Sequence, residues 1–483
     1  MAGLPAYLVT VAGELPLKSD RSRPRFYKRL IENLKDALSR EGIRVVECRV
    51  VDAKIYLSTD KEALSAISRV FGVHSAGRVL EYEFRELKDL AEWISENAKA
   101  MVSGRKFAVR VKRSGDHPFT SLDVAREAGA LLKPHSAGVD LENPEVVVEV
   151  EVRGHKAYLY VERAEGPKGL PVGVEGSALV LFSGGFDSPV AAWLSAKRGI
   201  RVDFLHYIMG STQISYNAFL VAKELASKWL HGYRPLFISV DFRDVIAEVS
   251  EKVEWSFRQV VLRALMYIVA ARIARERGYD ALVTGESIGQ ASSQTLKNLV
   301  SIEAVANTGI PVLRPLLGFD KEEIIELSRK IGLYELSSRV AEACAIAPSR
   351  VETRADPAEL KKQLERVSAS VIDKALSTMR VVDLLSASPE DAVLPSDVEI
   401  DFIPSGALVI DARGRAERVE APLHGAVPLE EVDFENLPRD RVIVVVCETG
   451  SVSYVIAKEL RDRGYKAYSL KHGLKGCKLP ATS

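Results

Sequence analysis

The stretch Ser183-Gly184-Gly185-Phe186-Asp187-Ser188 decides the fold of the central part of this chain. An apolar run at residues 178–182 leads into it, and a helix-forming segment at residues 189–197 leads out. The small residues at its start let the backbone approach a ligand closely. Ser188 is expected to cap the helix, with Pro189 in its first turn. The stretch therefore predicts an anion site, because free N–H groups at a helix start attract phosphate.

Asp187 is an acid inside this predicted phosphate-binding loop, which charge alone disfavours. A magnesium ion or a transferring group bound beside it would explain its presence. The loop is not a Walker A motif, because the Lys-Ser/Thr pair at the required spacing is absent. The six residues resemble instead the PP-loop of the ATP pyrophosphatases, which split ATP between its α and β phosphates and activate a substrate by adenylation. A plain glycine turn between strand and helix is the alternative.

The bulk properties describe a soluble globular protein of about three or four domains in 483 residues. Apolar residues make up 47% and charged residues 27%, and no apolar run is long enough to span a membrane. Residues 1–14 carry no signal-like core, so we expect a cytoplasmic protein with no membrane partner. Because 66 basic and 66 acidic residues cancel, any nucleic-acid-binding surface must be local.

The four cysteines, Cys48, Cys344, Cys447 and Cys477, lie far apart and form no C-x-x-C motif. This spacing argues against a protein-held metal site and against a dense disulfide framework. It fits a reducing compartment in which one or two thiols are reactive.

Residues 1–70 are predicted to form a small domain with a strand at 6–11, a helix at 25–39 and a hairpin from 44–51 and 53–58. The segment from residue 18 to residue 44 contains nine basic and only four acidic residues. Such an excess suits a phosphate backbone, and a solvated helix face is the alternative. The candidate RNA-contacting residues here are Arg21, Arg23, Arg25 and Lys28.

Residues 71–165 are predicted to form a second domain, with helices at 87–98 and 122–133, the latter capped by Ser121. Strands are expected at 107–112, 146–153 and 157–163. Basic residues crowd the turn after the first strand and suit contact with RNA phosphates. They are Arg110, Lys112, Arg113 and His117. The stretch 107–121 resembles the THUMP domain of RNA-modifying enzymes, and residues 1–70 resemble the ferredoxin-like domain that precedes it in the 4-thiouridine synthases.

Residues 177–345 alternate strands and helices after a Gly- and Pro-rich linker at 166–176. This alternation predicts a doubly wound parallel sheet, with its ligand at the carboxyl ends of the strands. The predicted strands are 178–182, 201–208, 236–240, 281–284 and 312–313. The predicted helices are 189–197, 217–230, 245–253, 257–277 and 321–331.

Polar residues at the ends of these elements are candidate nucleotide contacts. His206 ends the second strand, where an adenine could stack or bond, and a buried core histidine is the alternative. Arg263 lies in an otherwise apolar helix and needs a partner, either a phosphate or a nearby acid. A polar turn at 284–295 is suited to closing over a nucleotide. Asp320 is expected to cap the last helix, and Lys321 could reach an oxyanion.

In order along nearly the whole chain, these segments resemble the 4-thiouridine tRNA sulfurtransferases, the ThiI family. The resemblance implies that ATP and Mg²⁺ are the cofactors, that tRNA is the substrate, and that Asp187 and Lys321 are needed for activation. The ATP-contacting positions that it implies are Leu181, Phe182, His206, Tyr207, Arg263, Gly285 and Gln294. The PP-loop residues that it places on the pyrophosphate are Ser183, Gly184, Gly185, Asp187 and Ser188.

Residues 346–400 are interpreted as a connector with two helical segments, and residues 401–483 as a small α/β domain. Cys447 follows a buried strand at 442–446 and precedes a helix at 454–463. Backbone N–H groups of such a loop stabilise a thiolate or persulfide. With the D-x-R and G-A-x-P motifs, this domain resembles a rhodanese. It departs from many rhodaneses at Glu448, where they have Arg, so reactivity toward thiosulfate is in doubt.

The family resemblance further implies a relay between two cysteines. Cys447 carries a persulfide loaded by a cysteine desulfurase, and Cys344 then forms a disulfide with Cys447 that a reductant reopens. The sequence around Cys344 alone allows either a thiol activated by Arg339 and Arg350 or a buried structural cysteine. A homodimer is a further expectation from the family.

The whole chain is thus predicted to be an α/β multidomain protein: an α+β ferredoxin-like and THUMP half, a PP-loop domain and a rhodanese domain. Three alternatives stay open. The same chemistry could supply a sulfur-carrier protein for thiamine thiazole synthesis. The protein could be a different, amide-forming PP-loop ligase, or an RNA-binding protein with a decayed ATP site.

Overall fold

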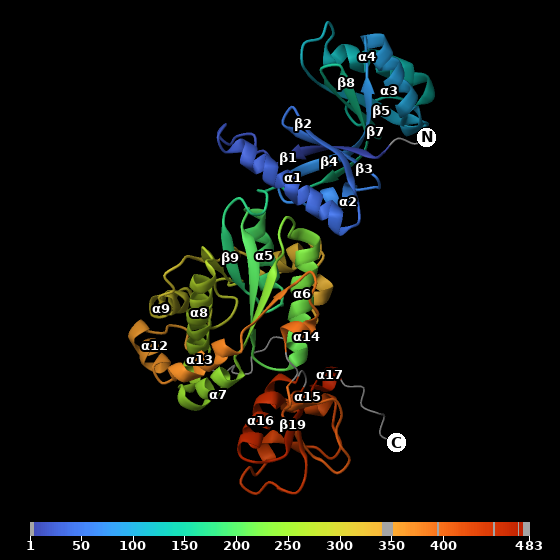
Figure 1. The fold of residues 1–483 in the computed structure, drawn as a ribbon. Helices are drawn as coiled ribbons and strands as arrows, with labels where there is room; N and C mark the ends of the chain where they lie inside the picture. The colour runs from blue at the N-terminus through green and yellow to red at the C-terminus, as the bar shows by residue number, and fades with distance from the viewer. Residues whose placement is uncertain (1–3, 341–350, 394–395, 448–449, 472, 477–483) are drawn as a thin grey trace. The chain divides into compact units, whose positions relative to one another are not determined.

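The computed structural model describes residues 4–340, 351–393, 396–447, 450–471 and 473–476. The chain divides into two compact units, one formed by Met1–Val174 with Lys197–Gly199 and the other by Glu175–Ala196 with Ile200–Ser483 (Figure 1). Each unit is built on its own sheets, as the element order confirms. In the described part of the chain, no helix is both long enough and apolar enough to cross a membrane.

The N-terminal unit contains one eight-stranded sheet with the order β2-β3-β1-β4-β8-β7-β5-β6. Its strands are β1 Ala6–Val11, β2 Val45–Val51, β3 Lys54–Thr59, β4 Val73–Glu83, β5 Lys106–Ser114, β6 Gly138–Val139, β7 Val146–Arg153 and β8 Lys156–Glu165. Its helices are α1 Arg23–Arg40, α2 Leu64–Ile67, α3 Leu87–Val102, α4 Ser121–Leu132 and the 3₁₀ turn Lys133–His135. The predicted strands and helices of this half are confirmed to within a few residues.

Two details of the N-terminal prediction are wrong. Thr120, not Ser121, caps α4: its hydroxyl accepts the Asp123 N–H (3.2 Å), while the Asp123 carboxylate accepts the Thr120 N–H (2.7 Å). A capping box of this kind fixes the helix start, and Ser121 becomes the first helical residue. The boundary at residue 70 also falls before β4, which pairs with both β1 and β8, so the two halves share a continuous sheet.

The second unit is built around a six-stranded sheet with the order β13-β12-β9-β10-β11-β14. The first five strands in this order are mutually parallel, as predicted. They are β9 Ser177–Leu181, β10 Arg201–Ile208, β11 Leu236–Asp241, β12 Ala281–Val283 and β13 Val312–Leu313. The helices are α5 Asp187–Lys197, α6 Thr212–Trp229, α7 Arg243–Lys252, α8 Arg258–Arg277, α9 Leu296–Ala306, α10 Lys321–Lys330 and α11 Tyr334–Ser337, with a 3₁₀ turn at Trp255–Phe257.

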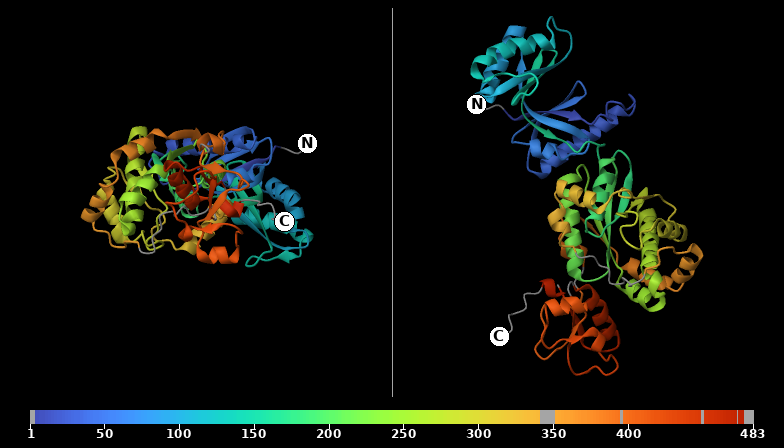
Figure 2. Two further views of the ribbon diagram at one scale, coloured as in Figure 1. Left: turned by 90° about the horizontal axis from the view of Figure 1, so that it is seen from below. Right: turned by 180° about the vertical axis from the view of Figure 1, so that it is seen from behind.

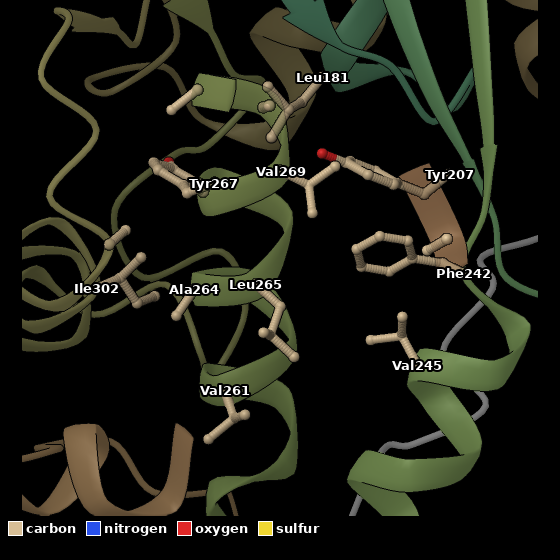
Figure 3. Packing of buried hydrophobic residues seen from close by; sticks show 14 of the residues in the cluster. Leu181, Tyr207, Phe242, Val245, Val261, Ala264, Leu265, Tyr267, Val269 and Ile302 are labelled. Carbon is tan, nitrogen blue, oxygen red and sulfur yellow. The ribbon is translucent and has the colours of Figure 1, made fainter. Parts of the chain in front are cut away.

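Helices flank this sheet on both sides, which is the doubly wound arrangement. Figure 1 shows α6 and α8 on opposite sides of the strands, and the view from behind in Figure 2 agrees. Helix α8 buries apolar side chains on more than one side, because it packs against several neighbouring elements. Leu265 and Val269 point toward Tyr207 and Phe242, whereas Ile302 of α9 lies near Ala264 (Figure 3). The sequence prediction missed α9.

The connector predicted at 346–400 is wrong for its described residues. Strand β14 (Arg380–Asp383) joins the central sheet antiparallel to β11. Helices α12 (Pro357–Leu364) and α13 (Ala369–Ser377) belong to the same domain, since Leu360, Val367 and Ala375 are buried in its main core. Their apolar faces need a surface to cover, and a single sequence does not show which surface that is. A short helix, α14 (Pro389–Ala392), follows.

The last domain contains a five-stranded parallel sheet with the order β15-β19-β18-β16-β17. It begins two residues before the predicted boundary, because Glu399 and Ile400 form its edge strand. Its strands are β15 Glu399–Ile400, β16 Leu408–Asp411, β17 Val427–Pro428, β18 Ile443–Val446 and β19 Ala467–Leu470. Its helices are α15 Arg415–Glu420, α16 Ser451–Asp462 and α17 Gly473–Gly476, with a 3₁₀ turn at Leu429–Glu431.

Candidate active site

The PP-loop connects β9 to α5, and Ser188 holds it in shape. The Ser188 hydroxyl accepts the backbone N–H groups of Ser183 (3.1 Å) and Gly184 (3.2 Å). The helix starts at Asp187, two residues before the predicted start, so Ser188 is not its cap. The predicted capping role is wrong, because the hydroxyl instead binds the N–H groups of the loop residues that precede the helix. The loop thereby acquires a fixed curvature around the space where an anion would bind.

Two glycines let neighbouring elements approach this loop. Gly184 has φ +84°, and a Cβ there would lie 2.6 Å from the Ala218 Cα of α6. A Cβ on Gly285, two residues after the end of β12, would lie 2.8 Å from both the Asp187 carbonyl carbon and the Ser188 nitrogen. Backbone atoms cannot move away from an added Cβ as the end of a flexible side chain can. Both positions therefore require glycine.

Replacement of Gly285 with Ala should therefore displace the PP-loop. We expect the KM for ATP to rise about tenfold, since overpacking of this kind usually introduces 1–3 kcal/mol of strain, roughly one to two powers of ten. Steady-state kinetics with varied ATP checks the effect. Gly318→Ala is the matched control, because no atom lies within 4 Å of its added Cβ. Equal KM values for the two variants would contradict the close approach of Gly285 to the loop.

Asp187 and Lys321, the two residues predicted to serve activation, lie in contact. Lys321 Nζ is 2.8 Å from Asp187 Oδ1, and Gln290 Nε2 donates to Asp187 Oδ2 at 2.8 Å. The predicted Asp320 cap is confirmed: Asp320 and Glu323 form a capping box that starts α10 and so places Lys321 in its first turn. Both side chains of the ion pair are partly exposed, at 36% and 25%, so they remain accessible to a ligand.

The side chains of His206 and Tyr207 are already occupied by the protein. His206 is buried, with Nδ1 2.9 Å from the Phe182 carbonyl oxygen and Nε2 3.0 Å from the Ser215 hydroxyl. Burial lowers its pKa to about 4, so the ring is neutral and donates from Nδ1 to the carbonyl. Tyr207 donates to the Met266 carbonyl (2.6 Å), and burial raises its pKa. The buried core histidine, the alternative reading, is what the structure contains.

This neutral histidine makes stability depend on pH. The unfolded chain takes up a proton on His206 below pH 6.5, whereas the folded chain does so only near pH 4. Stability is therefore fully present above pH 6.5 and falls by ~3 kcal/mol as the pH drops from 6.5 to 4. Urea unfolding at several pH values measures this slope. His206→Asn should remove most of it, and the exposed-site control His135→Gln should not. An unchanged slope in His206→Asn would contradict the assignment.

Arg263 forms an ion pair with Glu286, so the acidic partner, which was the alternative to a phosphate, is present. Its Nη1 donates to Glu286 Oε1 (3.1 Å), and its Nε donates to the Ser293 hydroxyl (3.2 Å). Glu286 is only 4% exposed and also accepts hydrogen bonds from Arg314, Tyr267 and Thr284. Burial alone would raise the Glu286 pKa, but Arg263, Tyr267 and Arg314 outweigh it and hold the pKa below its usual value.

The other predicted ATP contacts lie close to these groups. Leu181 ends β9 and Phe182 follows it, and Phe182 packs edge-on against Phe204. Gln294 accepts the Ser287 N–H at 3.2 Å and so closes the 287–294 turn. Glu286 and Gln290 lie in the polar turn at 284–295 that the sequence singled out, but neither was predicted as a site residue. Arg314 was missed by the sequence prediction.

Cys447 lies at the end of β18 in the predicted cradle. Its Sγ accepts the Gly450 N–H (3.2 Å) and the Ser453 N–H (3.5 Å), and the Ser453 hydroxyl is 3.3 Å away. The thiol is 4% exposed, and α16 begins at Ser451, directly after Gly450. These contacts confirm the predicted cradle of N–H groups, which favours an anionic sulfur. In the D-x-R motif, Asp411 and Arg413 form a buried bidentate ion pair.

Two predictions about the cysteines and their neighbours lie outside the described residues. Cys344 falls in the segment 341–350 and Glu448 in the pair 448–449. The pairing of Cys344 with Cys447 and the direction of the Glu448 side chain therefore stay predictions.

The candidate RNA-contacting residues differ in their exposure and in the contacts that their side chains already make. In the first group, Arg21 and Lys28 are exposed, whereas Arg23 pairs with Asp20 (3.0 Å) and Arg25 lies over the Phe26 ring. All four belong to α1 or to the turn before it.

In the second group, His117 is a structural residue. Its Nε2 lies 2.7 Å from the Gly154 carbonyl oxygen, and its Nδ1 lies 2.7 Å from Arg113 Nη1. Because Arg113 can only donate, the imidazole accepts at Nδ1 and donates from Nε2. Arg110 donates to the Leu141 carbonyl, and Lys112 is exposed. Arg110 and Lys112 are thus the exposed cations of this group.

Comparisons with known proteins agree with this architecture. Residues 173–369 match the family model described as thiamine biosynthesis protein (ThiI), residues 81–162 match the THUMP domain, and residues 7–77 match the ThiI ferredoxin-like domain. The chain is 58% identical over 471 residues to a tRNA sulfurtransferase of Desulfurococcus amylolyticus, covering 98% of each chain. It is 36% identical to a tRNA sulfurtransferase of Pyrobaculum aerophilum, covering 95% of each.

Among solved structures, the chain is similar to a 4-thiouridine synthetase crystallised with RNA and bound ATP. The sequence identity is 30%, the match covers 79% of this chain and 99% of that one, and the TM-score is 0.68.

Proposed function

This chain belongs to the ThiI family and is an ATP-dependent tRNA sulfurtransferase; we propose that it converts the uridine at position 8 of tRNA into 4-thiouridine. The observation that carries the proposal is the contact of Asp187 with Lys321 beside the PP-loop. An acid paired with a lysine at the start of a phosphate-binding helix suits the activation of an oxygen by ATP rather than simple nucleotide storage.

The first step is adenylation of the uridine. The O4 oxygen attacks the α-phosphorus of ATP, a phosphorus–oxygen bond forms, and pyrophosphate leaves. The curved PP-loop holds the pyrophosphate through its N–H groups, and Lys321 stabilises negative charge on the phosphate oxygens. A poor leaving group at C4 is thereby replaced by AMP.

Magnesium is the proposed metal of this step. Mg²⁺ in nucleotide sites is held by one or two carboxylates together with phosphates and waters. Asp187 offers one such carboxylate within the PP-loop, and no group of three His, Cys, Asp or Glu that could hold a metal gathers in the described part of the chain. A metal carried in with ATP therefore fits the donor set better than a permanent ion. Bound there, it would neutralise charge on the phosphates.

The second step delivers sulfur from Cys447. A cysteine desulfurase loads this thiol with one sulfur atom, giving a persulfide that the N–H groups of Gly450 and Ser453 favour as an anion. The terminal sulfur attacks C4 and AMP leaves with the original oxygen. The Cys344 thiolate then attacks the Cys447 sulfur, so a Cys344–Cys447 disulfide forms and the thiouridine departs. A cellular reductant reopens the disulfide.

Mass spectrometry of the nucleosides in tRNA tests the whole proposal. Purified protein, unmodified tRNA, ATP, Mg²⁺, cysteine and a cysteine desulfurase should together yield 4-thiouridine, and omission of ATP should abolish it. A tRNA with cytidine at position 8 is the matched control and should stay unmodified. Equal thiolation of both tRNAs would overturn the position, and product without ATP would overturn the activation step.

A second acceptor of the same sulfur is favoured by the family description, thiamine biosynthesis protein. A sulfur-carrier protein with an adenylated C-terminus would take the Cys447 sulfur as a thiocarboxylate, and its mass would rise by the replacement of one oxygen by sulfur. The cytoplasmic location and a homodimer stay predictions. Gel filtration of the purified chain, alone and with tRNA, decides the second.

A further inference from the structure

Glu286 is a buried carboxylate that binds two arginines, and the two are not equivalent. Arg314 Nε lies 2.8 Å from Glu286 Oε2, whereas Arg263 Nη1 lies 3.1 Å from Oε1. Tyr267 and Thr284 also donate to Oε2. Glu286 is 4% exposed, so the ion pairs are shielded from solvent and their charges act strongly on whatever is bound nearby.

Arg263 is held in place while part of it stays uncommitted. Its Nε is bound by Ser293 and its Nη1 by Glu286. Its Nη2 makes no hydrogen bond to any residue in the described ranges, and the side chain is 27% exposed. A guanidinium with two fixed edges and one open edge is preorganised to bind an anion, because little side-chain freedom remains to be lost.

Arg314, in contrast, has all its nitrogens in use. Besides Glu286, it donates from Nη2 to the Tyr267 hydroxyl (3.1 Å) and from Nη1 to Glu303. Its side chain is only 12% exposed, and it has no edge to offer a ligand. Its position directly after β13 places it beside the end of β12, where Gly285 and Glu286 lie.

The charges of this cluster explain why two arginines are present. If Arg263 were the only cation on Glu286, the carboxylate would cancel the positive charge that an anionic ligand needs. With Arg314 on the same carboxylate, one positive charge of the two arginines remains beside Glu286. Glu303, the other carboxylate on Arg314, is 47% exposed, so water and salt screen its charge. The arginine that keeps an open edge is Arg263.

We propose that Arg314 is a positioning residue for the nucleotide: it neutralises Glu286, so that Glu286 can orient Arg263 without cancelling its charge toward a phosphate of ATP. Arg314 itself does not touch the nucleotide. This inference rests on the proposed function, because it takes ATP as the ligand of Arg263.

Binding of α,β-methylene ATP, which cannot be cleaved at the reacting bond, tests the proposal by calorimetric titration. Arg314→Gln should weaken binding about tenfold. Arg314→Lys keeps the charge and should bind within about threefold of the wild type. A purely geometric role would make the lysine variant as weak as the glutamine variant, which would overturn the proposal. Glu303→Gln is the matched control, because it removes the exposed partner of Arg314 only, and it should bind within about twofold.

A double variant supplies the sharpest readout. Glu286→Gln combined with Arg314→Gln removes one negative and one positive charge, so the net charge beside Arg263 returns to its original value. Its affinity should exceed that of Arg314→Gln alone, which is the opposite of what two independent losses of packing would give. An affinity below that of the single variant would overturn the proposal. Thermal unfolding of each variant shows that the titrated protein is folded.

Arg263→Gln separates failure of this inference from failure of the proposed function. If Arg263→Gln binds the analogue as tightly as the wild type, Arg263 is not a nucleotide contact and the assignment of the site is wrong. If Arg263→Gln binds weakly and Arg314→Gln binds normally, the site stands and the role of Arg314 is wrong.

Discussion

Replacement of Asp187 with Asn should reduce 4-thiouridine formation at least 100-fold. The carboxylate accepts hydrogen bonds from both Lys321 and Gln290, and it is the acid of the PP-loop itself. An amide cannot form the ion pair with Lys321 and is a poor ligand for Mg²⁺, so the charge on the phosphates would lose its stabilisation in the transition state. Loss of one such preorganised group typically slows a reaction 10²–10³-fold. Pyrophosphate release and 4-thiouridine, measured in the same reaction, should fall together.

Glu322→Gln is the matched control for this variant. Glu322 is an exposed acid in the first turn of α10, next to Lys321, and it is not part of the predicted site. Its replacement removes the same charge from the same neighbourhood and should leave activity within about twofold. If Asp187→Asn retained full activity, or if Glu322→Gln lost as much, the PP-loop would not be the activation site.

Replacement of Cys447 with Ser should abolish 4-thiouridine formation while ATP still reacts with the tRNA. The serine fits the cradle formed by Gly450 and Ser453, but its oxygen cannot carry a persulfide. A single round of pyrophosphate release should therefore remain, whereas sulfur transfer from cysteine and desulfurase should fall below detection. Quenched-flow measurement of pyrophosphate, followed by nucleoside mass spectrometry, separates the two steps.

Cys48→Ser controls for the general loss of a thiol. Cys48 lies half-buried on β2 of the N-terminal unit and should be dispensable. Undiminished 4-thiouridine from Cys447→Ser under limiting sulfide would remove Cys447 from the reaction and leave the C-terminal domain without its proposed role.

The strands of this protein were the easiest part to predict from the sequence. The limits of β1 and β7 were predicted to the residue, because segments rich in β-branched residues between turn signals leave few alternatives. The PP-loop was located from its own small residues. Its Gly184 marks a close approach to Ala218 that only a small residue permits.

The errors arose where a short polar side chain or a helix had two possible partners. Ser188 had the position of a cap, but its hydroxyl binds the loop behind it. Helices α12 and α13 looked like a connector, and their apolar residues instead complete the core of the nucleotide-binding domain. In both cases the partner is distant in sequence or reached only through the fold, so local pattern carries no information about it.

The residues of the candidate active site divide in the same way, into those that local sequence predicted and those that only the fold revealed. Asp187 and Lys321 were singled out by their local motifs and assigned to activation by the family resemblance, and they meet in space although 134 positions separate them. Arg263 was singled out correctly as a charge that needs a partner, but the choice between phosphate and acid required Glu286 to be placed. Arg314 had no sequence signal, because an arginine after a two-residue strand is indistinguishable from a surface charge until its burial is known.

The fate of the uridine oxygen tests the central claim, activation by adenylation, most directly. A tRNA carrying ¹⁸O at O4 of uridine 8 is incubated with ATP and the persulfide-loaded protein, and the nucleotides and phosphates are then analysed by mass spectrometry. Attack of O4 on the α-phosphorus, followed by displacement at C4, predicts one ¹⁸O atom in AMP and none in pyrophosphate. Recovery of the ¹⁸O in inorganic phosphate, with ADP as the second product, would show that the oxygen attacks the γ-phosphorus and would contradict the account.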